Sequence, residues 1–235
     1  MSRRIIACEV FKPYLDKLFE ESGIETVDYL EIRQHDHPEL LARSIQSIID
    51  DTKDVDEILL FYGLCGNAIL PLVSRGIPVK VLRVHDCAAA LMGSNVAYRK
   101  RFEGNPHKRY HCLSYGERDD EYFARTSPEY RKISEEYGED NADYVFAMLY
   151  DKFSTPVTYI KLGLDGEDAQ IRRKEEGYYS VIDGNLDLLR KMLKGDDDHV
   201  GVTLYPEHKF VGVYDYEEIL TTIKQHHDDE KTREE

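Results

Sequence analysis

Hydrophobic residues in the first hundred positions alternate between two patterns. Short apolar runs, typical of buried β-strands, alternate with stretches whose apolar residues recur every three or four positions, as in amphipathic helices. The predicted strands cover residues 4–10, 25–30, 57–62 and 78–84. The predicted helices cover residues 13–20, 38–51, 67–74 and 87–99. Four strand–helix units in a row predict a parallel, doubly wound sheet.

The pattern changes at residue 101 and resumes after Pro156. Residues 101–155 are rich in tyrosine and charge and predict two helices, at 121–137 and 141–153. The segment that follows predicts strands at 157–163, 177–182 and 200–204 and helices at 165–176 and 186–193. The predicted fold class is therefore α/β, with a doubly wound, mostly parallel, Rossmann-like sheet and a helical insert.

These patterns predict four regions. They are an N-terminal α/β lobe at residues 1–100, a helical insert at 101–155, a C-terminal α/β lobe at 156–225 and a disordered acidic tail at 226–235. Two linked α/β lobes and a single sheet with an insert both agree with this order of elements.

Composition narrows the function classes. The chain has 235 residues, 41% of them hydrophobic, which is enough for one core or two modest lobes. Its net charge of −15 disfavours binding to phosphate backbones, so we expect no nucleic-acid partner. No apolar run is long enough to span a bilayer and no signal-like segment opens the chain, so we expect a cytoplasmic protein without a membrane partner.

The four cysteines are Cys8, Cys65, Cys87 and Cys112, and none belongs to a C-x-x-C pair. In a cytoplasmic chain this spacing disfavours a disulfide framework and leaves buried packing, reactive thiols or metal ligands. Cys8, Cys65 and Cys87 each lie at or just after the end of a predicted strand. Because ligands bind outside the carboxyl ends of parallel strands, we expect these three thiols to converge on one crevice.

Thiolates are the ligands of zinc and of iron–sulfur clusters, and three of them leave one coordination position open. His85 is the nearest candidate for a fourth ligand, and Cys112 is an alternative that would close the site. We also expect the helices after Cys65 and Cys87 to direct their N-termini into the crevice and to lower the thiol pKa values. The alternative is that these cysteines pack as small hydrophobic residues.

Several neighbours of the cysteines are further candidates. Gly63, Gly66 and Asn67 form a turn that allows close approach of the backbone to a cofactor, although an ordinary strand-to-helix turn has the same pattern. The candidate catalytic residues are Arg83, His85 and Asp86, with Arg83 holding an anionic substrate. Asp86 is expected to cap a helix or to orient His85.

A pair of histidines elsewhere in the chain also has metal-ligand spacing. His35 and His37 flank an aspartate, but the segment is polar and no third ligand is near in the sequence. We expect a solvated loop there.

Four segments carry a family resemblance. They are Ile6-Ala7-Cys8, Tyr62-Gly63-Leu64-Cys65-Gly66-Asn67, Arg83-Val84-His85-Asp86-Cys87 and Leu91-Met92-Gly93-Ser94. Together they resemble the domain of unknown function 1638 family of archaea and anaerobic bacteria, closely over residues 4–100 and more loosely over 159–193. The resemblance implies occurrence near genes of corrinoid-dependent methyl transfer, and hence a corrinoid protein or a methyltransferase as a partner.

These observations give three functional hypotheses. The first is a metal-binding protein with zinc or an iron–sulfur cluster at the cysteines, acting on a small-molecule substrate as an enzyme or maturation factor of anaerobic one-carbon, corrinoid methyl or sulfur metabolism. The second is a non-catalytic module that binds a small molecule or a corrinoid protein. The third is a metal-free thiol enzyme, with Cys65 or Cys87 as nucleophile and His85 as base.

Overall fold

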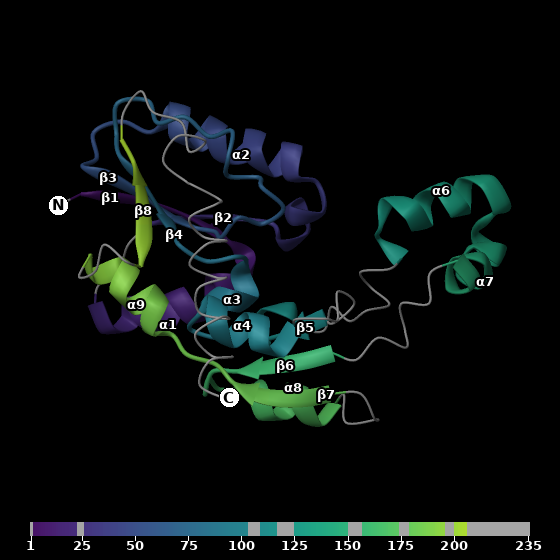
Figure 1. Ribbon diagram of the computed structural model, residues 1–235. Helices are drawn as coiled ribbons and strands as arrows, with labels where there is room; N and C mark the ends of the chain where they lie inside the picture. The colour runs from purple at the N-terminus through teal and green to yellow at the C-terminus, as the bar shows by residue number, and fades with distance from the viewer. Residues whose placement is uncertain are drawn as a thin grey trace, which may run out of the picture. The chain divides into compact units, whose positions relative to one another are not determined.

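The computed structural model describes residues 2–22, 26–102, 109–116, 125–149, 157–173, 179–195 and 200–205 (Figure 1). The chain divides into two compact units: unit 1 comprises Met1–Arg101 with Gly184–Glu235, and unit 2 comprises Phe102–Asp183. The predicted C-terminal lobe is thus shared between the two units, and the predicted acidic tail lies outside the described residues.

Unit 1 is built on a five-stranded sheet with the order β2-β1-β3-β4-β8. Its strands are β1 (Arg3–Cys8), β2 (Val27–Leu30), β3 (Glu57–Phe61), β4 (Val79–Leu82) and β8 (Gly201–Leu204). The first four are parallel, and β8 pairs antiparallel with β4 at the edge. Residues 58–61 of β3 are all buried, as expected for a central strand covered on both faces. The α/β class with a mostly parallel sheet is confirmed.

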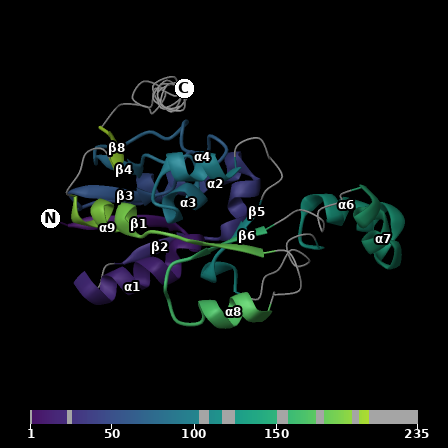
Figure 2. The same ribbon diagram turned by 60° about the horizontal axis from the view of Figure 1, so that its bottom comes forward.

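Helices cover both faces of this sheet, with α2 on one side and α1 and α9 on the other (Figures 1 and 2). The helices of unit 1 are α1 (Lys12–Ser22), α2 (Pro38–Asp51), α3 (Cys87–Leu91), α4 (Asn95–Phe102) and α9 (Asp187–Lys194), and its 3-10 turns are η1 (Glu9–Phe11) and η2 (Ile32–Asp36). The predicted periodicity holds in α2, where Leu41, Ile45 and Ile49 are buried.

Two helix predictions in unit 1 are wrong. Residues 65–71 form consecutive turns instead of a helix, because Cys65, Gly66 and Asn67 have φ values of 42°, 67° and 69°, outside the right-handed helical region. The single helix expected over 87–99 is two helices, α3 and α4, since Gly93 between them has a φ of 79°. Ser94 then accepts a hydrogen bond from the Ala97 N–H at 3.0 Å at the start of α4.

Unit 2 contains a three-stranded parallel sheet in the order β5-β6-β7. Its elements are β5 (Arg109–His111), η3 (Leu113–Tyr115), α6 (Pro128–Tyr137), α7 (Glu139–Leu149), β6 (Val157–Lys161), α8 (Glu167–Arg173) and β7 (Tyr179–Asp183). Strand β5 lies within the region expected to be a helical insert. It is too short to show a periodicity of its own, and its pairing with β6 is a long-range contact.

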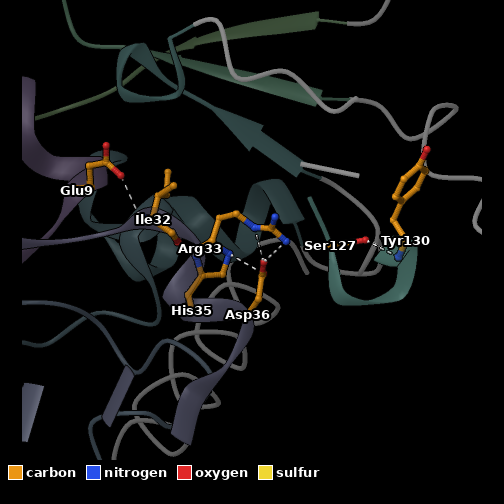
Figure 3. Close-up of polar contacts among 7 residues, drawn as sticks. All are labelled: Glu9, Ile32, Arg33, His35, Asp36, Ser127 and Tyr130. Atoms are coloured by element: carbon orange, nitrogen blue, oxygen red, sulfur yellow. Dashed lines mark hydrogen bonds and ion pairs between the residues drawn. The ribbon is translucent and has the colours of Figure 1, made fainter. Parts of the chain in front are cut away.

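The helices α6 and α7 form a hairpin within unit 2. Ser127 caps α6, and its hydroxyl accepts a hydrogen bond from the Tyr130 N–H at 3.1 Å (Figure 3). The two helices pack through Ile133, Ala142 and Phe146. Within the described part of the chain, no helix combines the length and the hydrophobicity needed to cross a membrane.

Candidate functional site

The candidate site lies at the point where the strand order of unit 1 reverses. The chain passes from β1 to β2 on one side and returns to β3 on the other side of β1, and ligands of open α/β sheets bind at the carboxyl ends of the strands at such a point. Cys8 is the last residue of β1, Cys65 lies in the turn after β3, and Cys87 opens the helix after β4.

The three thiols meet inside unit 1. The Sγ atoms of Cys65 and Cys87 are 3.9 Å apart, and the Cys87 thiol also contacts that of Cys8. All three side chains are buried, with exposed fractions of 4% for Cys8, 9% for Cys65 and 6% for Cys87. We call this group the thiol cluster.

The expected lowering of the thiol pKa by helix N-termini is wrong for Cys87. Hydrogen bonding with the Cys65 and Cys8 thiols, together with burial, raises the pKa of Cys87 well above its usual value. At Cys65 the expected helix is absent, because a series of turns follows that residue. Without a ligand, the environment of Cys87 therefore favours the neutral thiol.

Two loops that run side by side bring Cys65 and Cys87 together. The N–H of Leu64 donates to the carbonyl of Val84 at 3.2 Å, and the N–H of Cys65 donates to the carbonyl of His85 at 3.3 Å. Gly63 allows this approach, because a Cβ atom there would lie 2.7 Å from the oxygen of Val84. It would also lie 2.9 Å from Cα and N of Asp86, in the same loop as Val84. In this structure Gly63 serves contact between two loops; its predicted role toward a cofactor stays a prediction.

The turn after Cys65 has an unusual backbone. Cys65 itself has a φ of 42°, a left-handed conformation that costs free energy in a residue with a Cβ atom. Such strain clusters at functional sites, where the surrounding structure enforces it. Gly66 and Asn67, which follow with positive φ, are exposed, so the backbone on this side of Cys65 faces solvent.

Tyr62 is a member of this site that the sequence reasoning did not select. Its side chain is 1% exposed, and burial followed by the nearby thiols of Cys8, Cys87 and Cys65 raises its pKa. The Cys8 thiol lies beside its hydroxyl, yet the two do not meet in hydrogen-bond geometry, and no described residue hydrogen-bonds that oxygen. Only its position at the end of a buried strand, directly before Gly63, signals this role in the sequence.

Asp86 caps a helix, one of the two roles expected for it, and its orienting of His85 stays a prediction. Its Oδ1 accepts a hydrogen bond from the Ala89 N–H at 2.9 Å and caps α3. Its Oδ2 lies 3.8 Å from Nδ1 of His85 and raises the pKa of that imidazole. The His85 ring also stacks on Tyr98, with centroids 5.4 Å apart. The His85 side chain is half-exposed, and its role as a fourth metal ligand stays a prediction.

Arg83 lies at the entrance to the same loop. Its side chain is exposed, while its carbonyl accepts from Nδ2 of Asn95 at 3.2 Å. Oδ1 of Asn95 in turn accepts from the His85 N–H at 2.8 Å, so one amide side chain fixes the loop before Cys87. The expected binding of an anionic substrate by Arg83 stays a prediction.

The His35 region makes local contacts of its own. Nε2 of His35 lies 3.2 Å from Oδ1 of Asp36, and Nδ1 contacts the carbonyl of Ile32 (Figure 3). Arg33 pairs with the same aspartate at 3.3 Å. Glu9, which directly follows Cys8, accepts from the Ile32 N–H at 3.1 Å and so ties the end of β1 to η2.

The spacing of the sulfur atoms in the thiol cluster is close to that of a metal site, although the described residues hold no arranged ligand set. Across the described residues, no group of three or more His, Cys, Asp and Glu side chains is already arranged to hold an ion. The Cys65–Cys87 separation of 3.9 Å nevertheless agrees with the sulfur–sulfur edge of a tetrahedral zinc–thiolate site, about 3.8 Å for a Zn–S bond of about 2.3 Å. Cys112, the candidate for closing the site, is buried in unit 2 and precedes η3.

The fold and the thiol cluster define an α/β protein with a cysteine-lined site at the switch point of an open sheet. The family model described as "Protein of unknown function (DUF1638)" matches residues 29–193, more than half of the chain. The chain belongs to this family. The matched segment includes Cys65 and Cys87 and begins after Cys8. No curated protein and no solved structure matches the chain.

Proposed function

We propose that the protein binds a single soft metal ion, with zinc as the first candidate, through the thiolates of Cys8, Cys65 and Cys87. The observation that carries this proposal is the 3.9 Å separation of the Cys65 and Cys87 sulfurs beside the Cys8 thiol. A disulfide needs about 2.05 Å, whereas two ligands of one tetrahedral ion need about 3.8 Å.

The same separation favours one ion over an iron–sulfur cluster. Cysteine ligands of a cluster bind different iron atoms and are therefore further apart than ligands of one ion. Two packed thiols in simple contact have a similar spacing, so the test must measure the metal directly. The left-handed φ of 42° at Cys65 supports a functional site, because strained backbone is concentrated at such sites.

Three thiolates leave one coordination position for a substrate. A bound ion supplies Lewis-acid chemistry, which lowers the pKa of a bound thiol or water and prepares it as a nucleophile. In this chain the hydrogen-bonded loops of residues 63–65 and 84–87 would set the spacing of two ligands, and Asp86 lies 3.8 Å from His85. This site fits a methyl- or sulfur-transfer enzyme or maturation factor. The family resemblance suggests anaerobic one-carbon metabolism and a corrinoid protein or methyltransferase as partner.

The test is elemental analysis of the full chain purified without oxygen, beside the Cys65→Ser variant. We expect about one zinc per chain in the wild type and its loss in the variant. Cys112→Ser is the matched control, since it makes the same change at a buried cysteine of unit 2. Full metal content in Cys65→Ser contradicts the proposal, and so does an equal loss of metal in Cys112→Ser, because the loss would then not be specific to the thiol cluster.

A metal-free thiol enzyme is the second candidate, favoured by the His85–Asp86 pair next to Cys87. It requires a wild-type protein without metal in which iodoacetamide alkylates one cysteine selectively. A metal-free protein whose thiols do not react, but which captures a corrinoid or another small molecule, supports the non-catalytic binding module instead.

A further inference from the structure

The Tyr62 hydroxyl is a buried polar group without a partner. Its side chain is 1% exposed, and none of the described residues accepts a hydrogen bond from it. The thiols of Cys8, Cys87 and Cys65 are the titratable groups around it. The buried oxygen therefore lies near the thiol cluster and is shielded from solvent.

An unpartnered buried hydroxyl is costly, since it loses its hydrogen bonds with water and gains none in exchange. Phenylalanine would fill the same space without that cost. Buried polar groups without a hydrogen-bond partner are rare in native proteins. A ligand that binds beside such a group would supply the missing partner. The neighbourhood of the hydroxyl restricts such a ligand to the thiol cluster.

We propose, resting on the metal site above, that the fourth coordination position takes a small thiol bound as its thiolate, whose sulfur accepts a hydrogen bond from the Tyr62 hydroxyl. The three thiolates make the site soft, and its buried setting favours a polarisable sulfur ligand over a strongly hydrated oxygen anion. Tyr62 is a positioning residue: its hydroxyl favours a ligand whose bound atom has a lone pair that can accept a hydrogen bond from it.

The binding step balances without a redox partner. The S–H bond of the incoming thiol breaks, its proton passes to the buffer, and a sulfur–metal bond forms. Nothing is oxidised or reduced. The Tyr62 O–H bond stays intact and donates to the new thiolate, which stabilises the charged form of the ligand.

The experiment uses the full chain loaded with Co²⁺, whose visible bands report the ligands of the ion. We titrate the wild type, Tyr62→Phe and Tyr159→Phe with 2-mercaptoethanol, and with azide as a nitrogen anion. Tyr159 is a buried tyrosine of unit 2 whose hydroxyl donates to Gln170 at 2.7 Å, so it controls for the loss of a buried hydroxyl. We expect a saturable change with the thiol in the wild type and control, and binding weaker by about tenfold or more in Tyr62→Phe.

Each outcome separates the two proposals. A wild type that takes up no Co²⁺ contradicts the metal site itself. A wild type that binds Co²⁺, but whose bands do not respond to the thiol or respond only to azide, overturns the thiol ligand alone. Equal thiol affinity in the wild type and Tyr62→Phe, at equal Co²⁺ content, overturns the role of Tyr62. If Tyr62→Phe does not fold, the wild-type titration still decides whether a thiol binds.

Discussion

Replacing Gly63 with alanine tests how the two cysteine loops are held together. The new Cβ atom would lie 2.7 Å from the Val84 oxygen and 2.9 Å from Cα and N of Asp86. All three are backbone atoms, so no side chain can rotate away. Ordinary contact begins near 3.4 Å, and one loop must therefore move by about 0.7 Å relative to the other.

The size of the effect follows from that movement. Overpacking of this kind costs roughly 1–3 kcal/mol, and the displaced loop also weakens the hydrogen bonds of Leu64 and Cys65 to the neighbouring loop, 3.2 and 3.3 Å long. Metal ligands tolerate departures of only about 0.2 Å, so the 3.9 Å spacing of Cys65 and Cys87 would no longer suit one ion. We expect stability to fall by roughly 2 kcal/mol and metal affinity by at least about tenfold.

Urea unfolding of the metal-free protein measures the first effect, and competition for Zn²⁺ with a chromophoric chelator measures the second. Gly76→Ala is the control: Gly76 has a φ of 96°, and no atom lies within 4 Å of the position that an added Cβ would occupy, so alanine there strains the backbone without moving the cysteine loops. Its stability should fall while its metal affinity stays unchanged. A Gly63→Ala protein with wild-type stability and wild-type metal affinity would refute this reasoning.

Two further predictions concern carboxylates. Asp86→Asn keeps an acceptor for the cap of α3 but removes the charge that raises the pKa of His85, so the imidazole should titrate at a lower pH by NMR. The wild type should be more stable than the variant below a pH of about 6.5, the pKa of histidine in the unfolded chain. This difference in stability should disappear as the pH rises through the raised pKa of His85 in the folded protein. A difference that grows with pH would contradict the role of Asp86. Glu167 is fully buried, and its carboxylate accepts hydrogen bonds from the N–H groups of residues 162–164 at 2.7–3.0 Å. Glu167→Gln removes the charge that these N–H groups bind, so the free energy of unfolding in urea should fall by roughly 2 kcal/mol. An unchanged urea midpoint would show that the loop rearranges around the new side chain.

The sequence was sufficient to predict the strands of the main sheet, because a buried parallel strand is a continuous apolar run, as in residues 58–61. The sequence was insufficient where a few backbone angles decide whether a segment forms a helix or a turn. The apolar residues after Asn67 look helical, yet three successive positive φ values begin at Cys65. Likewise, β5 has three residues and depends on its partner β6 for its conformation.

The candidate site shows the same division. The placement of Cys8, Cys65 and Cys87 at strand ends could be predicted from their sequence positions, since carboxyl ends of parallel strands share an edge. The raised pKa of Cys87 could not, because it depends on which thiols touch it. The unpartnered hydroxyl of Tyr62 is likewise a property of packing, and no sequence pattern distinguishes it from an ordinary core tyrosine.

The antiparallel pairing of β8 with β4 has a consequence for biosynthesis. Val81 pairs with Val202, about 120 residues later in the chain, so during translation β4 emerges long before the strand that covers its outer edge. Until then β4 presents unpaired N–H and C=O groups to other chains in the cell. Closing so long a loop is also slow, and we expect nascent chains that stall before residue 201 to aggregate or to require a chaperone.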